Sequence, residues 1–228
     1  MQNLLDYFTK PYETYTYFQI IIEFSAAFLG ILSVFFAAKN NIWVFPTGIV
    51  STALYVYILF VFHLFGDMTV NFYYFIMSIY GWIHWSGKDN DDIELPISYM
   101  SNIDFKFSIF MFLGSIFFVI IVYFVFQIAN FDFVDLPNDK TKIFVFKLNW
   151  VNYIDVFTTS IFFVGMWLMA KKKIENWIFW IIGDILVIPM FFHKGLGITA
   201  IQYFIFLIPA IMGYINWKKQ YQYSKLLA

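Results

Sequence analysis

The chain has 228 residues, of which 61% are hydrophobic and 13% are charged, whereas soluble domains contain about 25% charged residues. Its formal net charge of −1 argues against a nucleic-acid partner, and the lack of arginine excludes phosphate binding by guanidinium groups. The lack of cysteine excludes disulfides and thiolate metal sites. Together with a mean hydropathy of +0.72, this composition predicts an integral membrane protein that resides in a lipid bilayer.

Seven apolar stretches have lengths close to the roughly 20 residues that a membrane-spanning helix needs. The polar and aromatic tail before them, residues 1–17, has no small-residue cleavage site, so we expect no removable signal peptide. The third stretch carries several polar side chains, and the fourth consists almost entirely of Phe, Ile and Val. Hydrophilic connections, 86–104 and 129–149, flank the fourth. The expected spans are 18–38, 42–62, 68–85, 105–128, 151–170, 174–192 and 198–217.

An internal duplication relates the two ends of the chain. The motif that starts at Gly81 (Gly-Trp-Ile-His-Trp) matches the one that starts at Gly213 (Gly-Tyr-Ile-Asn-Trp) at an offset of 132. Other matches in the same order are Ala38-Lys39 with Ala170-Lys171, Glu23 with Asp155, His63 with His193 at an offset of 130, and Trp43 with Trp177 after a two-residue insertion. We therefore predict an all-α membrane protein with two parallel three-helix repeats, 17–88 and 150–219, joined by a linker transmembrane helix, 105–128.

The lysines predict how the chain is oriented in the membrane. One side of the predicted topology has nine lysines, including Lys39, Lys171 and Lys218, and the other has five. Because positive residues favour the cytoplasmic side, we expect the N-terminus outside the cell and the C-terminus in the cytoplasm.

The sixth span contains the most distinctive group of side chains. Trp177, Trp180 and Asp184 are spaced at i, i+3 and i+7, so they share one face of a helix. Indole rings can stack on a planar ring and attract a cation on it, and a carboxylate can supply the counter-charge. An acid inside a bilayer costs about 2.5–3.5 kcal/mol on insertion scales, so it should face a cavity or a partner. The two tryptophans also fit an interfacial belt, since Lys173 is one turn away.

Other polar and aromatic residues are candidates for the same cavity. Gln202, one turn into the seventh span, is expected to hydrogen-bond the ligand. The matched acids Glu23 and Asp155 are expected to have gating or structural roles. The three histidines are too scattered to hold a metal, and we predict neither a metal nor a cofactor. Four further residues fit a ligand-binding role and a packing role equally well, namely Trp43, Asn71, Asn152 and Tyr153.

The motifs of common enzyme classes are missing from the sequence. There is no phosphate-binding Gly-x-x-x-x-Gly-Lys-Ser/Thr loop, no Ser-His-Asp set and no His-Glu-x-x-His motif, so we expect no enzyme activity. The last span has no lysine, which excludes a retinal protein. A polar pocket between two helical repeats is instead typical of transporters. A receptor-like or scaffold protein built on the same duplication is the alternative from another class.

The Trp177-x-x-Trp180-x-x-x-Asp184 signature, the repeated Gly-aromatic-Ile-x-Trp ends and the His193-Lys194-Gly195-Leu196 turn resemble the PnuC family of bacterial vitamin transporters. The resemblance covers residues 17–219. It implies a seven-span fold related to SWEET proteins, a homotrimer and a place in the bacterial inner membrane. It also implies facilitated diffusion of nicotinamide riboside, which a separate kinase then phosphorylates and traps. Relatives in the family carry thiamine or riboflavin; thiamine stays open because it is also a planar cation, whereas Asp184 disfavours neutral riboflavin.

Overall fold

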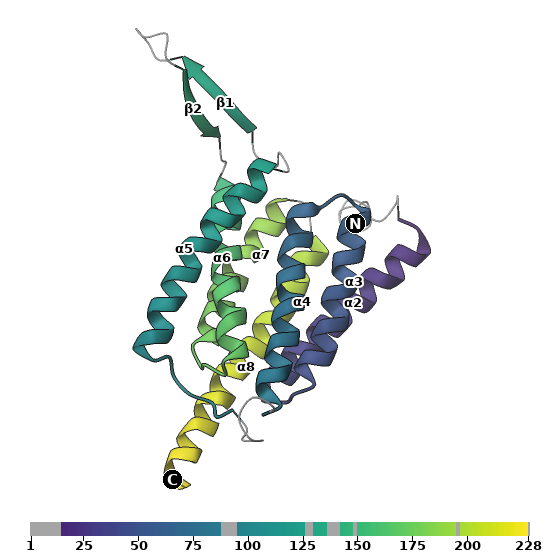
Figure 1. The fold of residues 1–228 in the computed structure, drawn as a ribbon. Helices are drawn as coiled ribbons and strands as arrows, with labels where there is room; N and C mark the ends of the chain where they lie inside the picture. Colours follow the sequence, from purple (N-terminus) through teal and green to yellow (C-terminus); the bar gives the residue numbers. More distant parts are fainter. Residues whose placement is uncertain are drawn as a thin grey trace.

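The computed structural model describes residues 15–87, 95–125, 130–135, 142–147, 150–194 and 197–227. In these residues seven long helices lie side by side, which confirms the predicted fold class (Figure 1). The helices are α2 (Tyr17–Ala38), α3 (Val44–Val61), α4 (Phe65–Trp85), α5 (Asn102–Val125), α6 (Trp150–Ala170), α7 (Asn176–His193) and α8 (Gly197–Leu227). Of the boundaries predicted for the repeats and the linker, residues 88 and 126–128 lie outside the described residues.

Two features of the connections were not expected from the sequence. Within 129–149, strands β1 (Asn130–Asp135) and β2 (Lys142–Lys147) form an antiparallel hairpin, with Asn130 opposite Lys147. The hairpin projects from one end of the helices, and the end of α8 projects from the other (Figure 1). Helix α8 has 31 residues because it continues past Trp217, where the predicted span ends.

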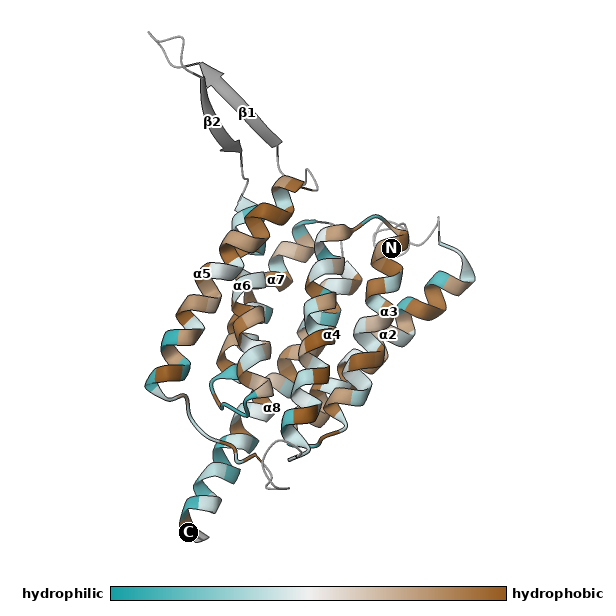
Figure 2. Ribbon diagram, viewed as in Figure 1, coloured by the Kyte–Doolittle hydropathy of each residue, from teal (hydrophilic) through white to brown (hydrophobic). Residues whose placement is uncertain are grey.

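Six of the described helices are long and apolar enough to cross a membrane. Helix α4 is the exception because polar residues interrupt its apolar sequence, yet its 21 residues lie between α3 and α6 in the same bundle (Figure 1). Helices α2 and α5 consist largely of hydrophobic residues (Figure 2). Phe110, Phe117 and Phe124 of α5 are exposed, whereas Ser108 and Ser115 on its other face are buried. This distribution is that of helices facing lipid.

Six of the helices pack in a closed order, and the seventh lies outside it. Helix α3 lies between α2 and α4, and α7 lies between α6 and α8. The two sets of three meet where α4 packs on α6 and where α8 packs on α2. Helix α5 packs mainly against α6, next to the seam between α4 and α6. Both sets of three therefore line the centre of the bundle.

The two sets of three helices match at a single offset of 132 residues. Helices α3 and α7 both have 18 residues, and their bounds differ by that offset. The turns before them have a left-handed residue at the corresponding position, Asn40 (φ 53°) and Lys172 (φ 51°). His63 and His193 differ by 130, so they are not equivalent: His193 ends α7, whereas α3 ends before His63.

The packing of aromatic rings corrects the alignment of Trp43 with Trp177. The ring of Phe45 meets Trp85 edge-on at a centroid distance of 4.9 Å and an interplanar angle of 89°. Trp177 meets Trp217 in the same way, at 5.4 Å and 89°. The counterpart of Trp177 is therefore Phe45, and no insertion is needed. Sequence comparison paired two tryptophans by residue type, but the conserved feature is a buried ring at one place in the packing.

Trp85 and Trp217 also join the two repeats at the lysine-rich end of the bundle. The Nε1–H of Trp85 donates to the carbonyl oxygen of Ala170 at 3.1 Å, and that of Trp217 donates to the carbonyl oxygen of Ala37 at 2.9 Å. The two indole rings are 5.8 Å apart. Each repeat thus satisfies a helix-end carbonyl of the other, as Nε1–H groups of buried tryptophans usually find an acceptor.

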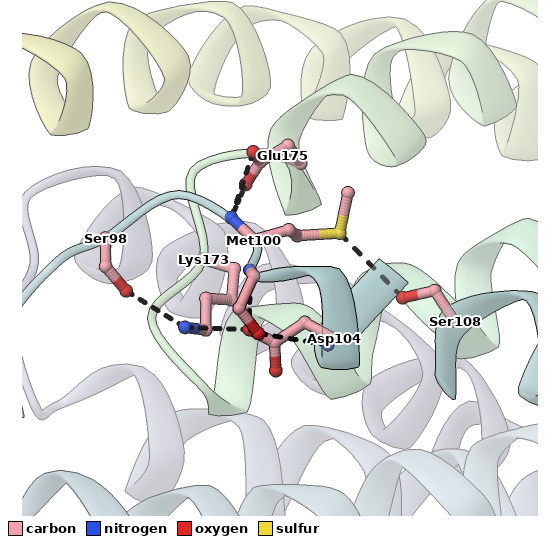
Figure 3. A network of polar contacts seen from close by, with 7 residues as sticks. Ser98, Met100, Asp104, Ser108, Lys173 and Glu175 are labelled. Atoms are coloured by element: carbon pink, nitrogen blue, oxygen red, sulfur yellow. Dashed lines mark hydrogen bonds and ion pairs between the residues drawn. The ribbon is translucent and has the colours of Figure 1, made fainter. Parts of the chain in front are cut away.

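A segment before α5 binds the turn between α6 and α7 in the second repeat (Figure 3). The backbone of Ser98 pairs with Lys172 and Ile174 at 3.1 and 3.0 Å. The Lys173 ammonium lies 3.0 Å from the Asp104 carboxylate, and the Met100 N–H donates to Glu175 (Figure 3). This strap, residues 95–101, ties the second repeat to the start of the linker helix.

Candidate functional site

Asp184 is the most deeply buried acid of the described chain, with an exposed fraction of 2%. It lies in the middle of α7, two turns from the helix end at His193. Its carboxylate forms no hydrogen bond or ion pair with any of the residues that the structure describes, although a buried carboxylate in a bilayer is costly unless it is paired. Asp184 is thus a buried charge without a hydrogen-bond partner among the described residues.

Aromatic rings from three helices surround this part of α7. The Trp180 indole stacks on Phe162 of α6, with centroids 5.2 Å apart and an interplanar angle of 25°. Tyr74 of α4 lies 6.1 Å from the same indole. Phe162 can approach this closely because residue 183 is glycine: a Cβ there would lie 2.0 Å from the Phe162 ring. Gly183, directly before Asp184, therefore leaves the space in which Phe162 stacks on Trp180 close to the acid.

Hydroxyl and amide groups complete the site from the other side. Tyr203 of α8 stacks near Phe162, with centroids 6.2 Å apart, and its hydroxyl is within electrostatic range of Asp184. The next residue toward the N-terminus, Gln202, donates from Nε2 to the hydroxyl of Tyr55 at 3.1 Å. This contact joins α3 of the first repeat to α8 of the second, and Glu23 lies within electrostatic range of Tyr55. The site thus combines ring faces, a carboxylate and neutral hydrogen-bonding groups.

Trp177 is separate from this group. Its exposed fraction is 1%, and its ring packs with Trp85 and Trp217 in the core at the lysine-rich end. Its Nε1–H is buried and has no acceptor among the described residues. Trp180 contacts both this core and the core that contains Phe162. The two tryptophans meet different neighbours because they lie nearly one turn apart along α7.

Trp43 and Tyr153 do not belong to the site in this structure. Trp43 directly precedes α3 and is 59% exposed, and Tyr153 is 60% exposed on the outside of α6. Tyr153 points outward because successive helical residues differ by about 100° in direction, and its neighbour Asn152 faces inward. Of the two roles left open for these rings, their exposure fits one outside the Asp184 group, and spacing alone does not say which face of a helix meets lipid.

Asn71, Asn152 and Asp155 belong to a second region, near the end of the bundle with the hairpin. Asn152 and Asp155 line a cavity of about 590 Å³, together with Asp67. The Asn71 amide donates to the carbonyl oxygen of Asp67 at 2.9 Å, so it supports the first turns of α4. The Asp155 carboxylate accepts a hydrogen bond from Tyr123 of α5.

Several residues of the site had no clear signal in the sequence. Phe162, Tyr74 and Tyr203 are ordinary aromatic residues in a chain with 32 Phe and 16 Tyr. The available hint was Gly183 directly before Asp184, because a helical glycine often marks a close approach of another side chain. No group of three or more metal-ligating side chains occurs in the residues that the structure describes.

Comparison with known proteins agrees with this architecture. The sequence model of the family described as "Nicotinamide mononucleotide transporter" matches residues 20–219. The chain belongs to this family. Proteins of the nicotinamide mononucleotide transporter family are multi-pass membrane transporters and not enzymes, which agrees with the missing enzyme motifs and the six apolar helices.

Two curated relatives and one solved structure are similar over most of the chain. The nicotinamide riboside transporters PnuC of Escherichia coli (strain K12) and of Shigella flexneri are each 22% identical over 209 residues, which cover 86% of this chain and 84% of theirs. The crystal structure of the vitamin B3 transporter PnuC is 23% identical with a TM-score of 0.60, and the match covers 87% of this chain and 81% of that one. The structural likeness establishes the fold.

Proposed function

We propose that this chain takes up nicotinamide riboside by facilitated diffusion, and that a separate kinase phosphorylates the riboside inside the cell and so traps it. The observation that carries the proposal is the buried Asp184 carboxylate, which has no partner among the described residues and lies beside a stacked pair of rings. Nicotinamide riboside has what these groups bind: a flat, positively charged ring and a neutral sugar.

The charged ring is expected to stack within the group formed by Tyr74, Phe162 and Trp180. Contact of a cation with an aromatic face contributes about 0.5–2 kcal/mol, with the larger values where water is excluded. The pyridinium charge would also relieve the cost of burying Asp184, since a carboxylate with a counter-charge is far less costly than one without. The two contributions act together only on a ligand that is both planar and cationic.

The ribose hydroxyls are expected to bind the amide and hydroxyl of Gln202 and Tyr55. These two groups already hydrogen-bond to each other at 3.1 Å, and each has further capacity to donate or accept. Because they come from different repeats, a sugar bound to both would connect the two halves of the transporter. Glu23, which is close to Tyr55, fits a gating role there.

The site favours a riboside over a mononucleotide. A phosphate group adds about 1.5–2 negative charges near neutral pH, and Asp184 would repel them. The chain has no arginine to form a phosphate clamp. The same repulsion would retain the phosphorylated product in the cytoplasm, so transport needs no ion gradient to accumulate the vitamin.

Thiamine is the second candidate, because it also has a planar cationic ring and the Asp184 group does not distinguish the two by charge. A membrane scaffold is the rival from another class, but it offers no reason to bury an unpaired carboxylate in the bundle. We place the protein in the bacterial inner membrane as a homotrimer, with the N-terminus outside and the C-terminus in the cytoplasm. The lysines at the α8 end support this orientation.

The test is uptake of labelled nicotinamide riboside into liposomes that contain the purified protein, with and without an excess of unlabelled thiamine. We expect equilibration of the riboside, unaffected by protonophores, and at least a tenfold loss of uptake in Asp184→Asn and Trp180→Ala. Matched controls are Asp104→Asn in the strap region and Trp82→Ala, which removes an indole that is 43% exposed. No uptake of either vitamin, or full activity of Asp184→Asn, would overturn the proposal.

A further inference from the structure

The cavity of about 590 Å³ described above is separate from the Asp184 group. It lies under the linker helix, and its lining comes from the start of α4, the end of α5, the start of α6 and the end of α7. We call it the α5 chamber. Neither Trp180 nor Asp184 lines it. Its volume is within the range of about 300–1,000 Å³ that small-molecule sites occupy, so it has room for a nucleoside-sized solute.

The α5 chamber is acidic and polar on one side. The Asp67 side chain is exposed to the chamber and forms no hydrogen bond among the described residues. The carboxylate of Asp155 lies within electrostatic range of it, and Lys194 is the cation of the described chain that offsets them in part. Asn152 and Thr159 add neutral hydrogen-bonding groups to the wall. Two carboxylates with one lysine leave an excess of negative charge that favours a cation.

The other side of the α5 chamber is apolar. Phe118, Val119 and Val122 of the linker helix form this wall, and the Tyr123 hydroxyl fixes the helix to Asp155 on α6. A chamber with one hydrophobic wall and one wall of carboxylates and amides fits an amphipathic cation. It does not fit a bare metal ion, since no group of three or more side chains that could hold a metal occurs in the described part of the chain.

A row of nearly parallel rings connects the α5 chamber to the Asp184 group. Phe191 lines the chamber and stacks on Tyr203, with centroids 5.2 Å apart and an interplanar angle of 15°. Tyr203 lies 6.2 Å from Phe162 at 13°, and Phe162 lies 5.2 Å from Trp180 at 25°. Phe191 and Tyr203 therefore stand between the two regions and present ring faces in a common orientation to both.

We propose that the α5 chamber is a second binding site for the same planar, cationic, hydroxyl-bearing solute, and that the solute waits there before it passes Phe191 and Tyr203 to reach Asp184. This inference rests on the proposed function and extends it. It also gives the linker helix a part in binding, because α5 supplies the apolar wall. Among the described helices, none packs along the corresponding seam between α8 and α2 as α5 does along the seam between α4 and α6.

The first experiment counts binding sites on the purified full-length protein by equilibrium binding of labelled nicotinamide riboside. We expect two sites per chain in the wild type and in the control Asp104→Asn. We expect one site in Asp67→Asn, one in Asp184→Asn and none in the double variant. Asp67 is chosen over Asp155 because the Asp155 carboxylate accepts a hydrogen bond from Tyr123, whose loss could disturb packing, and the Asp67 carboxylate accepts none from the described residues.

The second experiment measures uptake as a function of riboside concentration. Loss of one partly exposed charge contact corresponds to about a fivefold change in affinity, so Asp67→Asn should raise the half-saturating concentration about fivefold with an unchanged maximal rate. Uptake of the reduced, uncharged riboside should not change in this variant. If the half-saturating concentration rises equally for the charged and the uncharged riboside, the substitution has changed the structure rather than a charge contact, and the proposal is overturned.

The outcomes separate the two claims. A single wild-type site that Asp184→Asn removes and Asp67→Asn retains would leave the proposed function intact and overturn the α5 chamber as a binding site. A single site that only Asp67→Asn removes would support the chamber and refute the role given to Asp184. A wild-type protein that binds no riboside would overturn both.

Discussion

Substitution of Gly213 by alanine tests the packing that joins α7 to α8. A Cβ at this position would lie 2.5 Å from Cε2 and Cζ2 of the Trp177 ring, whereas ordinary contacts begin at 3.4 Å. The ring would have to withdraw by about 1 Å, but it is 1% exposed and fixed edge-on against Trp217. Overpacking of this kind costs about 1–3 kcal/mol, and the higher helix propensity of alanine offsets about 0.5–1 kcal/mol of that.

The matched control is Gly114→Ala in α5, where an added Cβ meets nothing within 4 Å. For a chain of this length, 1 kcal/mol corresponds to about 2–4 °C in Tm. We therefore expect Gly114→Ala to leave the Tm unchanged or slightly higher. Gly213→Ala should melt about 2–12 °C below Gly114→Ala, because alanine brings the same helix propensity to both positions and only Gly213 has the clash. Thermal unfolding in detergent, followed by size-exclusion chromatography of the remaining folded protein, measures both.

A double variant identifies the cause of the expected loss. Trp177→Phe removes Cζ2 and Cη2, two of the atoms that the new methyl group would meet. Gly213→Ala should then cost less in the Trp177→Phe background than in the wild type, with a coupling of about 0.5–3 kcal/mol. If the two substitutions are additive, or if Gly213→Ala melts within about 1 °C of Gly114→Ala, the reasoning from ring packing is refuted.

Two further predictions concern the lysine-rich end. Trp217→Phe removes one of two donors to the Ala37 carbonyl oxygen, which keeps the Asn40 N–H, and should cost at least about 0.5–1.5 kcal/mol for the lost hydrogen bond. Trp82→Phe, at an exposed position of α4, should melt like the wild type. Ser101→Ala removes the capping hydroxyl that accepts the Asp104 N–H at 3.2 Å and should cost about 0.5–2 kcal/mol. Differential scanning fluorimetry measures both, and an unchanged Tm in either variant contradicts the role given to that hydrogen bond.

The helices and the duplication were predictable because each rests on a pattern within the sequence. Apolar length predicts spans, and the repeated Gly-aromatic-Ile-x-Trp ends predict the repeats. Matching tryptophan with tryptophan failed because Phe45 and Trp177 fill the same place with different side chains. Asp184 was identifiable because an acid in an apolar helix is costly, whereas Phe162 was not, because its role depends on Gly183 of a neighbouring helix.

The strap and the α5 chamber could not be predicted from sequence patterns, for a related reason. Both depend on contacts between segments that are distant in the chain, such as Ser98 with Ile174 and Tyr123 with Asp155. The 86–104 connection reads as hydrophilic, so nothing in its composition indicates that residues 95–101 pair with the second repeat. The acid at Asp67 lies in the first turn of a helix, where acids are common for helix-capping reasons alone.

The two repeats have the same arrangement of helices but different side chains at the positions that correspond to Trp180 and Asp184. At the offset of 132, the first repeat has Gly48 and Thr52 where the second has Trp180 and Asp184. A Cβ on Gly48 would lie 3.1 Å from the Ser33 hydroxyl and 3.3 Å from that of Ser78, and the Thr52 hydroxyl donates to its own helix. The first repeat is thus packed through small residues and offers no charge at the position of Asp184.

This asymmetry has a consequence for transport. Under the proposed function, a solute at the centre would meet a carboxylate and an indole from the second repeat, but hydroxyl groups of Tyr55 and Tyr74 from the first. The strap binds the second repeat through the backbone pairing of Ser98 with Lys172 and Ile174, and the first repeat has no equivalent among the described residues. If the repeats move relative to each other, the tyrosines of the first repeat would therefore move past Asp184, which stays with the second repeat and the linker helix. Under the proposed function, the charge that selects the solute would remain in place while the path opens from one side to the other.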